Sequence, residues 1–150
     1  MSDLPASVVF ACDRNTVRSP MAAAIMRHLF GHRVAVGSVG VRADGEVPDG
    51  YAVAVMAELG LDIAGHEATP FEAVDFAAVD LIVTFTPRAH HRALALAGTA
   101  CVVEYWPMAD PPDDGEATRE DRLAAYRALR EAILARIAVR FPAVDAPQMA

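Results

Sequence analysis

The sequence predicts an α/β protein with a mostly parallel sheet, because apolar runs typical of strands alternate with helical stretches along the chain. Strands that alternate with helices need crossover connections, and these make neighbouring strands parallel. Open parallel sheets bind ligands beyond the carboxyl ends of their strands. The residues that follow each strand are therefore the first place to look for a site. The predicted strands, each short and rich in β-branched residues, are Ser7–Ala11, Val34–Gly37, Leu81–Thr84 and Cys101–Tyr105.

Four other stretches have the pattern of helices. Glycine follows two of them, at Gly60 and Gly98, where a helix commonly ends. The last stretch has apolar residues at spacings of three and four, and it is preceded by Thr118, which with Asp121 resembles a capping box. The predicted helices are Met21–Phe30, Pro48–Leu59, Pro87–Ala97 and Arg119–Arg140.

Composition and charge indicate one globular domain over residues 1–150, with 141–150 as a less ordered tail. Hydrophobic residues make up 54% of the chain, which argues against disorder. The net charge of −7 disfavours nucleic acid and anionic membranes as partners. No apolar run approaches the roughly 20 residues of a membrane span, and the N-terminus lacks a signal-peptide pattern. We therefore expect a cytoplasmic protein with reduced thiols, either a monomer or a weak homodimer.

The segment after the first predicted strand combines a cysteine, a short loop and a helix start. Cys12 ends the strand, five residues follow, and then come Arg18, Ser19 and Pro20. Serine as a cap followed by proline at the first helical position is a strong helix start. Free backbone N–H groups and the positive end of the helix dipole converge on such a loop, which predicts an anion site. The residues expected to line it are Asp13, Arg14, Asn15, Thr16, Val17, Arg18 and Ser19.

The chemistry predicted for this loop is attack by the Cys12 sulfur on the phosphorus or arsenic of a bound oxyanion. The planar Arg18 guanidinium can bind two oxygens at once. The same positive field is expected to lower the pKa of the Cys12 thiol, and Ser19 can donate a hydrogen bond to the thiolate. An inward carboxylate opposes anion binding, so we expect Asp13 and Arg14 to project to the rim, where they can select the substrate.

A phosphomonoester needs a proton on its leaving oxygen, and Asp110 is the candidate donor. It follows the fourth predicted strand, so it can reach the same edge of the sheet as Cys12. Pro111 stiffens the loop that presents it. Asp113 and Asp114 are nearby competitors, which we interpret as solvated loop charges.

This loop resembles that of the low-molecular-weight protein tyrosine phosphatases and of the thiol-dependent arsenate reductases that share their fold. The family pattern is Cys-x-x-Asn-x-x-Arg-Ser-x-Met-Ala. Matches along the rest of the chain are Ser38-Val39-Gly40 and Gly60-Leu61-Asp62-Ile63 with His66. The chain carries the pattern of the loop as Cys12, Asn15, Arg18, Ser19, Met21 and Ala22.

The resemblance implies a single-domain fold of the phosphotyrosine protein phosphatase I type, in which a four-stranded parallel sheet has helices on both faces. It implies that Cys12 is the nucleophile and forms a phosphocysteine intermediate, and that Arg18 clamps the transition state. Asn15 would shape the loop in a left-handed conformation, which asparagine tolerates. Ser38 would brace Asn15, and His66 would buttress the loop.

The chain departs from the family pattern at two places. Many members carry a second cysteine beside the loop arginine, where this chain has Val17, so a protective disulfide is not expected. The phosphatases usually carry an aromatic residue after the Asp-Pro pair, where this chain has Pro112 and Asp113. Tyr51 or Trp106 can replace that wall, although each is also a candidate packing residue.

Three functions stay open from the sequence. The first is a phosphatase for an aryl phosphate or a tyrosine-phosphorylated protein. The second is an arsenate reductase, which would need an external thiol such as glutathione or mycothiol because Cys101 lies in an apolar strand and is interpreted as core. The third is a catalytically idle phosphate-binding module. No metal or cofactor is expected, since the histidines lack the carboxylate or thiol neighbours of a metal site: His28, His32, His90 and His91.

Overall fold

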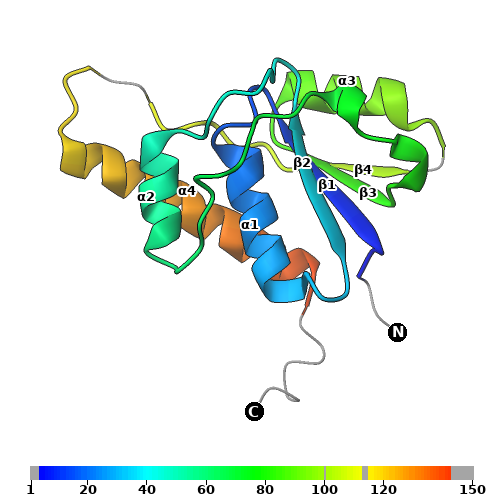
Figure 1. Ribbon diagram of the computed structural model, residues 1–150, viewed down its shortest axis with the longest axis horizontal. Helices are drawn as coiled ribbons and strands as arrows, with labels where there is room; N and C mark the ends of the chain where they lie inside the picture. The colour runs from blue at the N-terminus through cyan, green and yellow to red at the C-terminus, as the bar shows by residue number, and fades with distance from the viewer. Residues whose placement is uncertain (1–3, 100, 113–114, 143–150) are drawn as a thin grey trace, which may run out of the picture.

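The computed structural model describes residues 4–99, 101–112 and 115–142 and contains a four-stranded parallel sheet with the strand order β2-β1-β3-β4 (Figure 1). The order of elements alternates between strand and helix, as the sequence predicts. The strands are β1 (Ser7–Cys12), β2 (Ala35–Gly40), β3 (Leu81–Thr84) and β4 (Val102–Tyr105). The helices are α1 (Arg18–Phe30), α2 (Gly50–Ala57), α3 (Pro87–Ala97) and α4 (Arg119–Arg140), with 3₁₀ turns η1 (Phe71–Ala73) and η2 (Phe76–Ala78).

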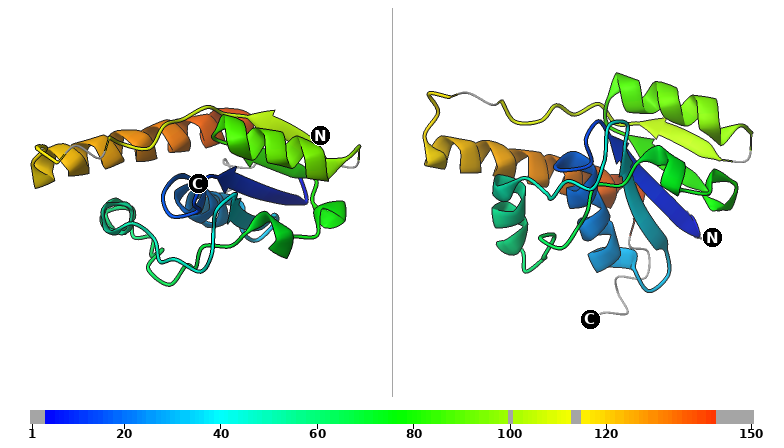
Figure 2. Two further views of the ribbon diagram at one scale, coloured as in Figure 1. Left: turned by 90° about the horizontal axis from the view of Figure 1, so that it is seen from above. Right: turned by 45° about the horizontal axis from the view of Figure 1, so that its top comes forward.

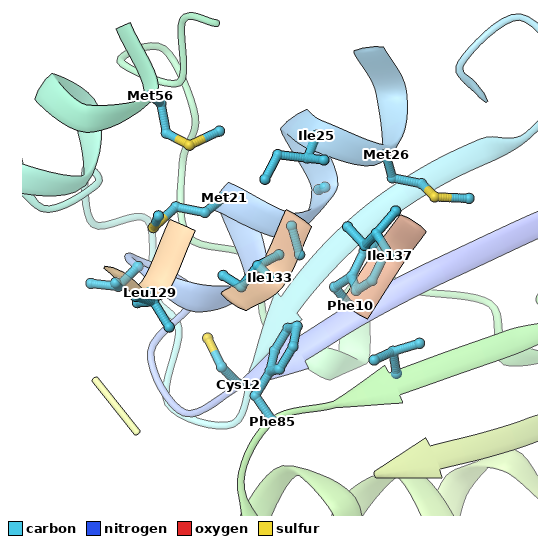
Figure 3. Packing of buried hydrophobic residues seen from close by; sticks show 14 of the residues in the cluster. Phe10, Cys12, Met21, Ile25, Met26, Met56, Phe85, Leu129, Ile133 and Ile137 are labelled. Atoms are coloured by element: carbon cyan, nitrogen blue, oxygen red, sulfur yellow. The ribbon is translucent and has the colours of Figure 1, made fainter. Parts of the chain in front are cut away.

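Helices cover both faces of the sheet, and each face has its own core. Val8, Phe10 and Cys12 of β1 pack into the larger core with α1, α2 and α4 (Figure 3). Val9 and Ala11 point the opposite way and pack against α3 and the two 3₁₀ turns. Because successive strand residues face opposite sides, β1 is buried on both and is held rigidly beneath the loop that follows it.

Strand β2 is longer at its end than the sequence predicts, and this extension matters for the site. Phe10 pairs with Ser38, Ala11 with Val39 and Cys12 with Gly40, so β2 runs beside β1 to its last residue. Ser38 and Gly40 are residue types that are common in turns, but the parallel pairing with β1 keeps them extended. The end of β2 therefore lies against the loop after Cys12.

Helix α2 begins at Gly50 rather than at the predicted Pro48, because Asp49 caps it. The Asp49 Oδ1 accepts hydrogen bonds from the backbone amides of Tyr51 at 2.8 Å and Ala52 at 3.3 Å. The backbone amide of Asp49 donates to the carbonyl of Thr16 at 3.0 Å. This last bond ties the start of α2 directly to the loop after β1.

Helix α4 carries the predicted capping box and extends past the sheet beside α2 (Figure 2). Arg127 and Arg130 of α4 hold Glu58, at the end of α2, with hydrogen bonds of 2.7–3.0 Å. Both guanidiniums favour the ionised carboxylate, and the pKa of Glu58 falls to about 2. The pairs fix α2 against α4, and these two helices form one wall of the site described below.

The chain after α4 differs in part from the expected tail. Phe141 is buried and packs edge-on against Phe30 of α1, so the packed domain includes the first residue of the predicted tail. Residues 143–150 lie outside the described part of the chain. Among the described residues, no helix has the length and the apolar character needed to cross a membrane.

Candidate active site

Cys12 lies at the carboxyl end of β1, and α1 begins six residues later at Arg18, so the loop between them caps the edge of the sheet. The carbonyl groups of Cys12 and Asp13 accept hydrogen bonds from the amides of Val41 at 3.1 Å and Arg42 at 2.7 Å. The amide of Asn15 points to the Cys12 sulfur at 3.3 Å. The loop is thus folded around the sulfur, and its carbonyls are directed away toward the chain after β2.

Asn15 is the residue that gives this loop its shape. It is fully buried and adopts φ 59°, the left-handed region that the resemblance implies. Its Oδ1 accepts a hydrogen bond from the amide of Thr69 at 2.8 Å, which fixes the orientation of the side-chain amide. Its Nδ2 therefore faces Ser19 and donates to the Ser19 Oγ at 2.6 Å.

His66 supports the same asparagine from the other side. Its Nε2 lies 2.9 Å from the Asn15 Oδ1 and 3.2 Å from the Asn15 carbonyl oxygen. Both atoms are acceptors, so the Nε2 must carry the proton. Burial lowers the pKa of His66, which keeps the ring neutral in this role. The position agrees with the buttress that the resemblance implies.

Ser38 does not occupy the bracing position that the resemblance implies. Among the described residues it makes no hydrogen bond to Asn15, whose side-chain partners are Ser19, His66 and Thr69. The reason is its register, because Ser38 is level with Phe10, two residues before the end of β1. Thr69, which no motif singled out, supplies the backbone donor instead.

Ser19 is not the helix cap that the sequence predicts. Val17 is at the N-cap position of α1, without a side-chain cap, and Ser19 lies inside the first turn. The Ser19 Oγ accepts from Asn15 and lies 2.9 Å from the Cys12 sulfur and 3.3 Å from the Val39 carbonyl. Its single hydrogen can point to the carbonyl when the sulfur is a thiol, and to the sulfur when it is a thiolate.

The pKa of the Cys12 thiol is shifted in the direction opposite to the expectation. The Ser19 hydroxyl, the Asn15 amide and the Arg18 charge all lower the pKa of the thiol, as predicted. Burial acts in the opposite direction and is the largest contribution, so the pKa of Cys12 is raised. The sequence shows the groups that favour a thiolate, but it does not show that Cys12 is 1% exposed.

Gly40 is the position at which the sheet and the loop approach most closely. A Cβ built there lies 2.7 Å from the Asn15 nitrogen and 2.8 Å from the Arg14 carbonyl carbon. Both are backbone atoms of the loop, which cannot move aside without displacing Asn15. Glycine at this position is therefore required by the shape of the loop.

Replacing Gly40 with alanine is expected to destabilise the protein by about 1–3 kcal/mol, because the added methyl group overpacks the loop. Phosphate or sulfate binding should weaken together with the stability, which urea unfolding and calorimetric titration would measure. Gly37→Ala is the matched control on the same strand, since its Cβ would meet only the Val9 side chain at an ordinary 3.7 Å. Equal effects of the two variants would contradict this assignment.

Arg18 is directed to the loop that follows β4. Its Nη1 donates to the Met108 carbonyl at 2.9 Å, and its Nη2 donates to the Asp110 Oδ2 at 3.1 Å. The Nε lies 2.8 Å from the Asp110 Oδ1. The structure thus brings together the predicted guanidinium and the predicted acid, which are 92 residues apart in the sequence.

Asp110 is held half-exposed at the edge of this site. Burial is the main influence and raises the pKa of its carboxyl, while Arg18 acts to lower it. Asp13 and Asp49 raise the pKa further. A carboxyl group whose pKa lies above its ordinary value is better able to hold a proton for transfer. The competing Asp113 and Asp114 lie outside the described residues.

Asp13 and Arg14 lie at the rim of the loop. The Asp13 Oδ1 accepts a hydrogen bond from the Thr86 hydroxyl at 2.7 Å, which draws the carboxylate toward the start of α3. Arg14 is exposed. Thr16 and Val17 are the two remaining residues of the predicted anion loop. The Thr16 carbonyl accepts a hydrogen bond from the start of α2, and the Val17 side chain is buried.

A cavity of about 490 Å³ opens beside Asp110, on the side of α2 and α4. Tyr51 lines it and stacks on Tyr126 of α4 with ring centroids 5.4 Å apart. Of the two candidate aromatic walls, Tyr51 therefore faces the cavity, whereas Trp106 is 1% exposed in the core. Tyr126 also belongs to the buried apolar face of α4, and the helical spacing of that face does not indicate this second role.

Cys101 cannot act together with Cys12 in this structure. Val102 is level with Leu81, and Leu81 with Val8, so Cys101 lies near the amino edge of the sheet and Cys12 at the carboxyl edge. At about 3.3 Å per residue the two are separated by roughly 16 Å along the strands. A disulfide needs Cα atoms within about 7 Å. Cys101 is buried, as predicted, and both cysteines are free.

The fold and the loop define a class of α/β proteins in which a cysteine lies at the base of an anion-binding turn between a strand and a helix. The family described as "Low molecular weight phosphotyrosine protein phosphatase" matches residues 7–135. The chain belongs to this family of enzymes.

The similar proteins are arsenate reductases and tyrosine phosphatases. "Glutaredoxin arsenate reductase" of Synechocystis is 28% identical over 130 residues, covering 87% of this chain and 92% of that protein. The structure "An arsenate reductase in the phosphate binding state" superposes with a TM-score of 0.70 at 26% identity, covering 89% and 94% of the two chains. A low molecular weight protein tyrosine phosphatase from T. tengcongensis superposes with a TM-score of 0.68 at 26% identity, covering 87% and 94%.

Proposed function

We propose that this chain is a cysteine-dependent phosphomonoester hydrolase for aryl phosphates, including those of tyrosine-phosphorylated proteins. The observation that supports this most is the position of Asp110, between the Arg18 guanidinium and a cavity walled by Tyr51. An acid beside such a cavity can protonate an aryl leaving group seated there. Arsenate reduction releases no aryl group and does not need the aromatic wall.

The proposed reaction has two steps. In the first, the Cys12 thiol gives its proton to a non-bridging oxygen of the phosphate dianion, and the resulting thiolate forms a bond to phosphorus. The bond from phosphorus to the leaving oxygen breaks, and Asp110 gives its proton to that oxygen. Arg18 and the loop amides stabilise the charge on the remaining oxygens. In the second, the Asp110 carboxylate takes a proton from water, whose oxygen attacks phosphorus and releases phosphate and the Cys12 thiolate. The thiolate then takes its proton back from the phosphate. The Ser19 hydroxyl donates to that sulfur as it leaves.

A second candidate function is arsenate reduction, which the names of the relatives favour. Because Cys101 lies at the opposite edge of the sheet, the arsenic–sulfur adduct on Cys12 would have to be resolved by an external thiol, such as glutathione or mycothiol. For either function we place the protein in the cytoplasm, on the support of its two free thiols.

Asp110→Asn is expected to remove the general acid, because an amide cannot donate an acidic proton, and the loss should depend on the leaving group. Hydrolysis of phenyl phosphate, whose leaving group needs protonation, should slow by about 10²-fold or more, while hydrolysis of p-nitrophenyl phosphate should slow much less. Steady-state kinetics on both substrates measure this. An equal loss on both would remove Asp110 from the acid role.

The same preparations decide between the functions. Turnover of arsenate with glutathione or mycothiol, without hydrolysis of either phosphate ester, would overturn the phosphatase proposal in favour of the reductase. Binding of phosphate with neither turnover would leave an anion-binding module without catalysis.

A further inference from the structure

The guanidinium of Arg18 contacts the loop after β4 and not the loop between β1 and α1, which ends at Arg18. Nη1 and Nη2 donate to the Met108 carbonyl and to Asp110, and the Nε is 2.8 Å from the same carboxylate. The Arg18 side chain is 9% exposed, whereas that of Asp110 is 46% exposed. Arg18 is therefore the fixed member of the pair, and Asp110 is the member that is free to leave.

The pair has one hydrogen bond, from Nη2, and one close contact, at the Nε, that lacks hydrogen-bond geometry. The Nε of Arg18 is buried and, among the described residues, has no hydrogen-bond acceptor in good geometry, although the Asp110 Oδ1 is close. A buried N–H without an acceptor is costly. An oxygen of a tetrahedral oxyanion above Cys12 can take this N–H, and it then competes with Asp110 for the same cation.

The charges around Asp110 determine whether its carboxyl takes a proton once the oxyanion has displaced it from Arg18. Arg18 and Arg14 favour its ionised form, whereas Asp13 and Asp49 oppose it. Burial also opposes it, and the pKa of the carboxyl is already raised. A bound oxyanion neutralises part of the Arg18 charge and adds negative charges of its own. Both effects raise the pKa of the Asp110 carboxyl further, which favours its protonated form.

We propose that the Arg18–Asp110 pair couples oxyanion binding to proton uptake. The incoming oxyanion takes Arg18 from Asp110, and the released carboxylate takes one proton from the solvent. This inference rests on the proposed function, because it needs the oxyanion to bind above Cys12. As a consequence of this coupling, Asp110 is protonated only when a substrate is bound. Without substrate it stays ionised and holds Arg18 in place.

The coupling is reciprocal, so protonation of Asp110 must strengthen oxyanion binding as much as the oxyanion strengthens protonation. Above the pKa of Asp110, the dissociation constant for an oxyanion should rise with pH, by up to about tenfold per unit for a single proton. Sulfate is the suitable probe, because it does not itself titrate in the range where carboxyl groups do.

The experiment is calorimetric titration of the full-length protein with sodium sulfate at several pH values, each in two buffers of different ionisation enthalpy. The difference between buffers gives the number of protons taken up. We expect uptake approaching one proton per sulfate just above the pKa of Asp110. We do not expect Cys12 to contribute, because burial raises the pKa of its thiol.

Two matched variants assign the proton. Asp110→Asn removes the proposed acceptor, so uptake should vanish, the affinity should no longer depend on pH, and at neutral pH sulfate should bind more tightly than to the wild type. Asp49→Asn removes a charge of the same sign from the same cavity, while asparagine keeps the cap of α2, and here uptake should persist.

The outcomes separate this inference from the function on which it rests. Sulfate binding without proton uptake, or uptake that persists in Asp110→Asn, would overturn the coupling and leave the phosphatase proposal intact. Failure of sulfate to bind the wild type at any pH would overturn both.

Discussion

Replacing Cys12 with serine is expected to reduce the hydrolysis of p-nitrophenyl phosphate by about 10⁴-fold or more, because the reaction then loses its nucleophile. The groups around the sulfur do not compensate. The Asn15 amide at 3.3 Å and the Ser19 hydroxyl at 2.9 Å can stabilise a thiolate. A hydroxyl group is far harder to ionise, and the burial that raises the pKa of the thiol acts against an alkoxide as well.

Cys101→Ala is the control for this experiment, because the second thiol lies at the opposite edge of the sheet. Its hydrolytic activity should stay close to that of the wild type. Circular dichroism and sulfate titration should show that Cys12→Ser is folded and retains the anion site, since serine differs from cysteine by one atom. If Cys12→Ser kept more than about one per cent of the activity, the thiol would not be the nucleophile.

Much of the fold could be predicted because its signals are local. The apolar runs of β1 and β3 and the periodic face of α4 lie within single elements, and each was found within about one residue of its bounds. The end of β2 was missed because Ser38 and Gly40 are extended only through pairing with β1, which no local pattern shows. The start of α2 was misplaced because the Asp49 cap was not recognised in the sequence.

For the site, too, the features within one short segment could be predicted, and those that join distant segments could not. Cys12 and Arg18 belong to one short segment, and their spacing alone indicates an anion loop. The pairing of Arg18 with Asp110 joins residues 92 positions apart, and Thr69 acts through its backbone amide, which its identity does not reveal. The direction of the Cys12 pKa depends on burial. These features follow from the packing of the whole chain, and so only the structure shows them.

Arg18→Lys is expected to lower kcat/KM for p-nitrophenyl phosphate by about 10²- to 10³-fold, the usual cost of losing one oxyanion donor group. Lysine keeps the positive charge, so this substitution tests the shape of the group. The guanidinium contacts the Met108 carbonyl and Asp110 through different nitrogens at once. A single ammonium group cannot reproduce this fork, nor can it bind two oxygens of one oxyanion in a plane.

Arg27→Lys is the matched control, because Arg27 is in the same helix and its guanidinium donates to the Val36 carbonyl at 3.0 Å, away from the site. It should change kcat/KM little. Phosphate binding should weaken in Arg18→Lys alone, and the leaving-group dependence should resemble that of Asp110→Asn, because the loop that presents the acid loses its anchor at Met108. If Arg18→Lys stayed within about tenfold of the wild type, positive charge alone would suffice at this position, and the planar fork would have no part in holding the oxyanion.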